Sequence, residues 1–400
     1  MKILIVTTFG FDPAFPSRPE QLQARALVRH GYQVVAHEYF DRRYPGQSTR
    51  HEWLPDGIPV HRARPYGFFA PESLLRLLVA ERPDIIHLQH MRNLLSFQTV
   101  VAARRLGIPT VLTVNGLLHD ADLVVDRERP LESPLRYDNL LTTPGRLLRS
   151  LARGAYPRRA FRNYLIHAPL LMVDRVISLA HGERDLLARI GIDPGIISVL
   201  PPSVDMHGYD PSIVTQPDPA RPMVLFIGQL VPRKGFDILA RAMPAVVRAV
   251  PGVRFVFVSF NRAGEAELRR IVEGGGVAQN FELRGQVNEA EKLRLLREAA
   301  VVAAPSRYEG FGIPLIEALL AGTPVVTTDV IACNEVIEHE RTGLLAPYGD
   351  HEALAAAIVR LIQNRDLART CVEAGRREVL ARYSADSLVA GLERVYRQLV

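Results

Sequence analysis

The chain has 400 residues, of which 48% are hydrophobic and 23% charged, enough to fill the cores of two or three globular domains of roughly 150 residues each. Cys333 and Cys371 are the only cysteines, which excludes a disulfide framework and favours a reducing, cytoplasmic setting. No apolar run reaches the roughly 18 residues of a membrane-spanning helix, and the run after Met1 is too short for a signal peptide, so we expect it to be a buried strand.

The net charge of +6 is concentrated in one segment. Residues 127–173 carry nine arginines and three acids, which leaves the rest of the chain formally neutral. We find no helix-turn-helix, zinc-finger or ribonucleoprotein signature and expect no nucleic-acid partner. A membrane surface or an acidic substrate is the favoured partner of this segment.

Short apolar strands alternate with helices along the first half of the chain, which predicts an α/β protein with a parallel, doubly wound sheet. The expected strands are 2–6, 33–37, 58–62, 84–88, 109–114, 175–178 and 196–200. The expected helices are 18–30, 71–80, 94–105 and 182–190. The loop after the first strand reads T-T-F-G-F-D-P and lacks G-x-G-x-x-G, so a nicotinamide dehydrogenase is not expected.

The strand 109–114 ends in Asn115-Gly116, and His119 follows shortly after. Ligands of doubly wound sheets gather at the carboxyl ends of the strands, so Asn115 and His119 are candidates to face a substrate. The structural alternative is an Asn-Gly turn followed by a solvated histidine.

The basic segment is predicted to be largely helical over 139–172, with breaks near Pro144-Gly145 and Pro157. Leucines, Phe161 and Tyr164 supply an apolar face beside the arginines. Two interpretations remain open. The helices lie in a membrane interface, or they pack on their own domain with the arginines in water.

Residues 205–222 contain four prolines and few apolar runs, and we predict that they link the first unit to a second doubly wound unit. The expected strands of the second unit are 223–227, 253–259, 281–284, 299–304, 324–328 and 343–346. Its expected helices are 235–249, 264–273, 288–298, 333–338, 350–363 and 365–381, and a last helix spans 385–399.

The loop G-Q-L-V-P-R-K-G at 228–235 joins the first strand of the second unit to a helix. Arg233 and Lys234 lie beside the N-terminus of that helix, and this combination can hold a diphosphate. The alternative is that both are exposed turn charges.

A second loop follows the strand 299–304 and reads P-S-R-Y-E-G-F-G-I-P-L-I-E at 305–317. Pro314 suits a first helical turn, which puts Glu309 in the loop and Glu317 in that turn. A helix N-terminus attracts anions, whereas the two carboxylates suit sugar hydroxyls. Alternatively, Glu309 is a solvated loop acid and Glu317 caps its own helix. Together with the cationic loop, this arrangement predicts a nucleotide-sugar site.

The whole chain resembles the retaining glycosyltransferase family 4, whose members have two facing Rossmann-like domains in the GT-B fold. The resemblance is carried mainly by residues 228–235 and 306–326, with support from P-D-I-I-H-L-Q-H at 83–90 and T-G-L-L-A-P-Y-G-D at 342–350. It implies three parts: an acceptor-binding domain at 1–205, a donor domain at 206–384, and a helix at 385–400 that packs back on the first domain.

The resemblance also implies roles for particular residues. Lys234 would hold the donor diphosphate, Glu309 the sugar hydroxyls and Glu317 the ribose. Lys234, Glu309 and Asn115 form the implied catalytic set. The implied donor-binding set is Gly228, Gln229, Arg233, Lys234, Glu309, Gly310, Phe311, Gly312, Glu317, Asn334 and Glu335. The implied acceptor side consists of Phe9, Gly10, Asn115 and His119.

Some positions depart from the family pattern. Gln229 replaces a frequent arginine, Asn115 replaces a frequent histidine, and C-N-E at 333–335 replaces a run that contains Pro-Glu.

The implied reaction is transfer of a sugar from a UDP-sugar or GDP-sugar to a hydroxyl of a glycan, a glycolipid or a small molecule. It proceeds with retention and with no metal or bound cofactor. Under the membrane interpretation of the basic segment, residues 127–173 contact the inner face of a membrane. The alternatives on this fold are a sugar-nucleotide epimerase, a phosphorylase and an inactive sugar-binding subunit.

Overall fold

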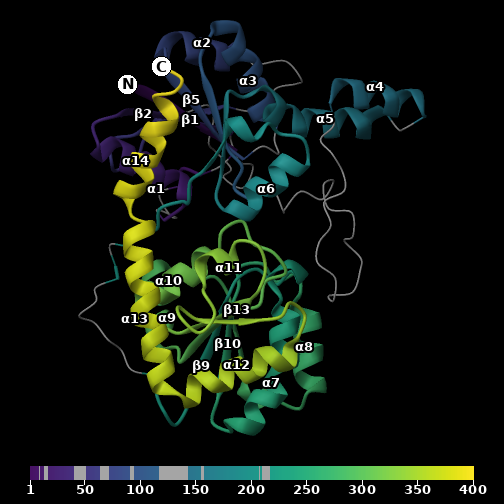
Figure 1. Cartoon of the computed structure of the whole chain (residues 1–400), viewed down its shortest axis with the longest axis vertical. Helices are drawn as coiled ribbons and strands as arrows, with labels where there is room; N and C mark the ends of the chain where they lie inside the picture. Colours follow the sequence, from purple (N-terminus) through teal and green to yellow (C-terminus); the bar gives the residue numbers. More distant parts are fainter. Residues whose placement is uncertain are drawn as a thin grey trace. The chain divides into compact units, whose positions relative to one another are not determined.

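The computed structural model describes residues 1–8, 10–12, 17–39, 51–63, 72–90, 94–116, 143–154, 157–206, 208–209 and 217–400. The described residues form two compact units, each built on its own sheet (Figure 1). Unit 1 comprises the described residues up to Val204 together with Tyr383–Val400, and unit 2 comprises those within Asp205–Arg382.

Unit 1 contains an eight-stranded sheet in the order β3-β4-β2-β1-β5-β6-β7-β8. Its strands are β1 (Lys2–Thr7), β2 (Gln33–Tyr39), β3 (His51–Trp53), β4 (Pro59–Ala63), β5 (Ile85–Gln89), β6 (Thr110–Thr113), β7 (Arg175–Ser178) and β8 (Ile197–Val199). Its helices are α1 (Pro19–Arg29), α2 (Glu72–Glu81), α3 (Leu94–Leu106), α4 (Pro144–Ala152), α5 (Pro157–Met172), α6 (His181–Arg189) and α14 (Ala385–Tyr396).

Every strand pair of unit 1 is parallel except β3–β4, which is antiparallel. The central strands are continuous apolar runs because helices cover the sheet on both faces. The prediction had omitted β3, since its three residues H-E-W carry no readable alternation. The described helix α4 begins at Pro144 behind the Thr143 cap, where a break had been predicted. Residues 139–142 of that predicted helix lie outside the described part.

The last helix belongs to unit 1, as the family resemblance implies. The apolar side of α14, including Leu392 and Val395, joins the core formed by Ile3 and Ile5 of β1. Figure 1 shows α14 beside α1, although the two helices are more than 350 residues apart in the chain. The end of the chain therefore completes the cover of the first sheet.

Unit 2 contains a fully parallel sheet of six strands in the order β11-β10-β9-β12-β13-β14. Its strands are β9 (Met223–Ile227), β10 (Arg254–Val258), β11 (Phe281–Arg284), β12 (Val301–Ala304), β13 (Val325–Thr328) and β14 (Leu344–Ala346). Its helices are α7 (Phe236–Ala249), α8 (Glu265–Gly274), α9 (Glu289–Glu298), α10 (Ile313–Ala321), α11 (Cys333–Val336), α12 (His351–Gln363) and α13 (Arg365–Arg382). Both sheets have the predicted doubly wound character, and α11 is two residues shorter than predicted.

Candidate functional site

Two loops of unit 2 meet where the neighbouring strands β9 and β12 end. The loop after β9 ends at Gly235, which is the N-cap residue of α7 and has a left-handed φ of +66°. A Cβ on Gly235 would lie 1.8 Å from the carbonyl oxygen of Pro305, in the loop after β12. The amide of Arg307 also donates to the carbonyl of Arg233 at 2.8 Å. The two loops are thus held together by their backbones.

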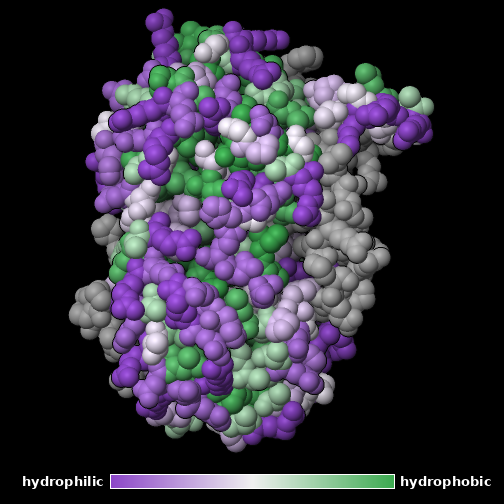
Figure 2. All heavy atoms as spheres, viewed as in Figure 1, coloured by the Kyte–Doolittle hydropathy of each residue, from purple (hydrophilic) through white to green (hydrophobic). Residues whose placement is uncertain are grey.

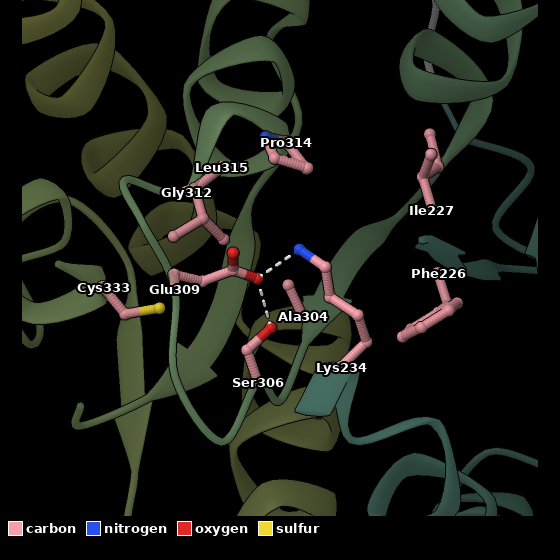
Figure 3. Close-up of a pocket in the computed structure, with 10 residues that line it drawn as sticks. All are labelled: Phe226, Ile227, Lys234, Ala304, Ser306, Glu309, Gly312, Pro314, Leu315 and Cys333. Atoms are coloured by element: carbon pink, nitrogen blue, oxygen red, sulfur yellow. Dashed lines mark hydrogen bonds and ion pairs between the residues drawn. The ribbon is translucent and has the colours of Figure 1, made fainter. Parts of the chain in front are cut away.

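The partly buried Lys234 and the buried Glu309 form an ion pair between these loops. The Nζ atom of Lys234 lies 2.5 Å from Oε1 of Glu309, and the Ser306 hydroxyl donates to the same oxygen at 2.6 Å (Figure 3). Arg233 approaches the other carboxylate oxygen at 3.6 Å. Only 8% of Glu309 is exposed, so the solvated-acid alternative is wrong. Arg233 and Lys234 are likewise not exposed turn charges, because their side chains are 19% and 16% exposed.

The surroundings of Glu309 act on its pKa in opposite directions. Burial raises the pKa, while the charges of Lys234 and Arg233 and the hydrogen bonds lower it by more, so the pKa lies below its ordinary value. The carboxylate is therefore ionised at neutral pH.

A small pocket opens beside this ion pair. Its lining includes Lys234, Ser306 and Glu309, and Gly312 and Cys333 lie on the same side as Glu309, opposite Lys234 (Figure 3). Burial, together with the negative charge of Glu309, raises the pKa of the Cys333 thiol to about 12. The departure at position 333 therefore places a neutral thiol next to the carboxylate.

Glu317 lies in the second turn of α10 and not in the first, because the helix begins at Ile313 behind a left-handed Gly312. It does not cap its own helix. Its Oε1 atom lies 2.8 Å from Nζ of Lys292 on α9, and Lys292 also pairs with Glu289 at 2.7 Å. Burial lowers the pKa of Lys292, but the charges and hydrogen bonds of Glu317 and Glu289 together outweigh it, so the pKa is raised.

Each of the two predicted acids is therefore paired with a lysine from another element. Lys2, Lys234 and Lys292 are the only three lysines in the sequence. The prediction missed Lys292 because it lies in an amphipathic helix, where a charge usually faces water. Its rarity in this arginine-rich chain was the available signal.

The other predicted donor-side residues also belong to unit 2. Gly228 and Gln229 lie in the loop after β9, where the amide of Gly228 donates to Val258. The buried Gly310 and Phe311 lie in the loop before α10. Asn334 and Glu335 lie on α11.

Of the four predicted acceptor-side residues, Phe9 and His119 lie outside the described part. Gly10 and Asn115 belong to unit 1 and follow β1 and β6. The amide of Gly10 donates to Glu38 at 2.9 Å. Asn115 has a φ of +50°, which suits a turn. Its side chain is partly buried and donates from Nδ2 to Oε1 of Gln89 at 2.7 Å, so it is not simply solvated.

The fold is that of GT-B glycosyltransferases. The structure of Anabaena Alr3699/HepE in complex with UDP and glucose matches with a TM-score of 0.72 and 17% identity over all of both chains. The sucrose-phosphate synthase of Thermosynechococcus elongatus matches with a TM-score of 0.72 and 21% identity, over 100% of this chain and 99% of that one. At these identities the likeness concerns the fold alone.

The sequence assigns the family. Residues 22–207 match the model of Glycosyltransferase Family 4, and residues 221–364 match that of Glycosyl transferases group 1. A phosphatidyl-myo-inositol mannosyltransferase of Mycobacterium leprae is 39% identical over 175 residues, which is 43% of this chain and 46% of that protein. A GDP-mannose-dependent alpha-(1-6)-phosphatidylinositol monomannoside mannosyltransferase of Mycobacterium tuberculosis is 33% identical over 270 residues, which covers 56% of this chain and 70% of that protein. The chain belongs to glycosyltransferase family 4. It spans about half the length of the Mycobacterium leprae relative.

Proposed function

We propose that the protein is a retaining glycosyltransferase that moves a sugar from a nucleoside diphosphate sugar to a hydroxyl acceptor. The observation that carries the proposal is the Lys234–Glu309 ion pair, which joins the two loops at the carboxyl ends of β9 and β12. This is the edge of a doubly wound sheet where ligands bind. The name of the mycobacterial relative makes GDP-mannose the first donor to test, with UDP-glucose as the second.

The charges of the site suggest how it would serve this reaction. As the bond from the sugar carbon to the diphosphate breaks, its electron pair passes to the diphosphate oxygen, and the acceptor oxygen bonds to the same carbon. Lys234, Arg233 and the N-terminus of α7 would stabilise the negative charge that develops. An ammonium that moves from Glu309 to the diphosphate would leave the carboxylate available to the sugar hydroxyls.

In this mechanism the acceptor proton passes to the departing phosphate, so we assign no protein base. The fixed cations would neutralise the diphosphate without a metal ion. Transfer that persists in excess EDTA is the expected result.

The test is transfer from GDP-mannose or UDP-glucose to phosphatidylinositol, with Lys234→Ala as the variant. Turnover should fall by about 10²–10³-fold if this cation stabilises the leaving group. Lys2→Ala is the matched control, because Lys2 lies in unit 1 and pairs with Glu81. Near-normal turnover of Lys234→Ala would refute the assignment. An epimerase would change the donor sugar without acceptor, and an inactive subunit would give no turnover.

We further propose that α4 brings the protein to an anionic membrane surface. Among the described helices, none is long and apolar enough to span a bilayer. None of the residues of α4 is buried, and Leu148 is 67% exposed. Leu148 and Leu151 lie on one face and Arg146 and Arg149 on another, and Figure 2 shows apolar and charged side chains together on this projecting part of unit 1.

Sedimentation with phosphatidylinositol vesicles tests this contact. The protein should bind the vesicles in low salt and be released in high salt. Leu148→Ser should weaken binding severalfold, whereas Leu106→Ser, at an exposed leucine of α3, should not. Absence of binding in low salt, or equal effects of the two substitutions, would contradict the role of α4.

A further inference from the structure

Unit 1 buries a group of polar side chains that the proposed reaction does not use. Gln23 of α1, His87 and Gln89 of β5, Thr113 of β6 and Tyr396 of α14 are all at most 6% exposed. His87 and Gln89 lie two residues apart, so they share the sheet face that α1 and α14 cover. Burial of this many polar groups is tolerated only when their hydrogen bonds are satisfied.

The hydrogen bonds form a continuous chain that begins at Asn115, outside the core. Nδ2 of Asn115 donates to Oε1 of Gln89 at 2.7 Å. Nε2 of Gln89 donates to Oε1 of Gln23 at 3.0 Å. Nε2 of Gln23 lies 2.9 Å from Nδ1 of His87. We call these four residues (Asn115, Gln89, Gln23 and His87) the amide chain.

The donor at the end of the amide chain decides the tautomer of His87. An amide nitrogen can only donate, so Nδ1 of His87 must accept and the ring proton must be on Nε2. From there it donates to the hydroxyl of Thr113 at 2.7 Å. The Tyr396 hydroxyl of α14 lies 2.6 Å from Nδ1. Burial lowers the pKa of His87 to about 3, so the ring stays neutral at physiological pH.

We propose that the amide chain fixes which atom of Asn115 faces the acceptor substrate. Because one N–H of Nδ2 is committed to Gln89, the amide of Asn115 has a fixed orientation, and it presents its carbonyl oxygen Oδ1 and its second N–H to a ligand at defined positions. At the position of Oδ1 the side chain accepts a hydrogen bond from a substrate hydroxyl, and it can donate only through the second N–H of Nδ2. The inference rests on the proposed acceptor-side role of Asn115 and adds Gln89, Gln23 and His87 as positioning residues.

The backbone of this loop is fixed separately from the side chain. The amide of Gly116 donates to Oε1 of the buried Glu183 at 3.1 Å, and the other oxygen of Glu183 accepts from Leu179 at 2.8 Å. Glu183 therefore holds the position of the loop, and the amide chain sets the orientation of the Asn115 side chain.

The Tyr396 hydroxyl can donate to Nδ1 of His87 or accept from it, and when it follows the tautomer of the ring, the amide chain has two self-consistent directions. In the second, all three amides are flipped and the His87 proton has moved from Nε2 to Nδ1. A change at Asn115 is therefore read out at His87, at the other end of the chain.

Nitrogen NMR of ¹⁵N-histidine-labelled protein at pH 7.5 tests the inference, with the His87 signal assigned by its loss in His87→Gln. In the wild type, Nε2 should carry the proton. Asn115→Asp offers only acceptors, so Gln89 must turn to donate, and the protonated nitrogen should become Nδ1. Asn115→Ala is the control, since it removes the donor without forcing a reversal, and Nε2 should stay protonated.

A wild-type ring protonated on Nδ1, or an Asn115→Asp ring that remains protonated on Nε2, would overturn the inference. Neither measurement depends on sugar transfer, so failure of the proposed function would appear separately as absence of turnover. In the transfer assay with phosphatidylinositol, Gln89→Leu should lower acceptor kcat/KM about tenfold and leave the KM for the donor within about twofold, because one oriented hydrogen bond is lost on the acceptor side only. An equal change in donor KM would also overturn the inference.

Discussion

Replacement of Lys234 by methionine tests whether Glu309 is an ionised, desolvated carboxylate that depends on the Lys234 ammonium for its stability. The substitution keeps most of the stem and removes the ammonium that lies 2.5 Å from Glu309. Removal of one partner of a buried pair costs about 3–5 kcal/mol, because the other charge stays desolvated. Arg233, at 3.6 Å, and Ser306 still contact the carboxylate, so we expect a loss of about 3 kcal/mol.

The loss should depend on pH. In the wild type the pKa of Glu309 is lowered, so its contribution to stability is present above its unfolded pKa and is lost as the pH falls. Without Lys234, burial dominates and raises that pKa, so the ionised carboxylate destabilises the variant at neutral pH. Protonation relieves this cost, and the difference between variant and wild type should therefore shrink between pH 7.5 and pH 5.

Urea unfolding followed by circular dichroism at both pH values measures this difference. Glu309→Gln in the Lys234→Met background is the matched rescue, because it removes the unpaired charge and keeps the shape. The double variant should recover most of the lost stability and show little pH dependence. An equal loss at both pH values, or no rescue, would refute the assignment of a buried, ionised Glu309.

Two further predictions concern unit 2. Gly235→Ala should lower the free energy of unfolding in urea by about 3 kcal/mol, because it places a Cβ at a left-handed φ and 1.8 Å from the Pro305 carbonyl oxygen. Gly276→Ala is the control and should cost only about 1 kcal/mol, because its φ is +69° but nothing lies within 4 Å of the added Cβ. Equal losses would contradict the close approach of the loops. Lys292→Met should weaken GDP binding about tenfold or more in calorimetry, because burial, which already raises the pKa of Glu317, would then act without opposition from the Lys292 cation. Unchanged affinity would exclude Glu317 from the proposed nucleotide site.

The sheets and their loops were predictable because short apolar strands and glycine or proline boundaries leave local signals. The position of the loops that carry Lys234 and Glu309 at one edge of the sheet also followed from sequence, since the carboxyl ends of parallel strands share that edge. The direct ion pair between the two side chains was not predicted. The pairing of Glu317 with Lys292 did not follow, because it depends on how α9 packs beside α10.

The amide chain could not be predicted from the sequence for a related reason. His87 lies in the apolar run D-I-I-H-L, and its partners come from α1 and from α14, more than 300 residues later. Local patterns report which residues are buried but not which distant side chain satisfies them. The second-turn position of Glu317 was missed because helix boundaries vary by a residue or two.

The scarcity of lysine gives the protein an uncommon chemical property. Besides the α-amino group, an acylating reagent specific for amines can react only at Lys2, Lys234 and Lys292. The side chains of Lys234 and Lys292 are 16% and 15% exposed and form ion pairs with the two acids, whereas the side chain of Lys2 is 27% exposed and lies in unit 1. Mass spectrometry of the acylated chain would therefore monitor the Lys234–Glu309 and Lys292–Glu317 pairs of the proposed donor site separately, with Lys2 as the internal standard and with no need to know the acceptor.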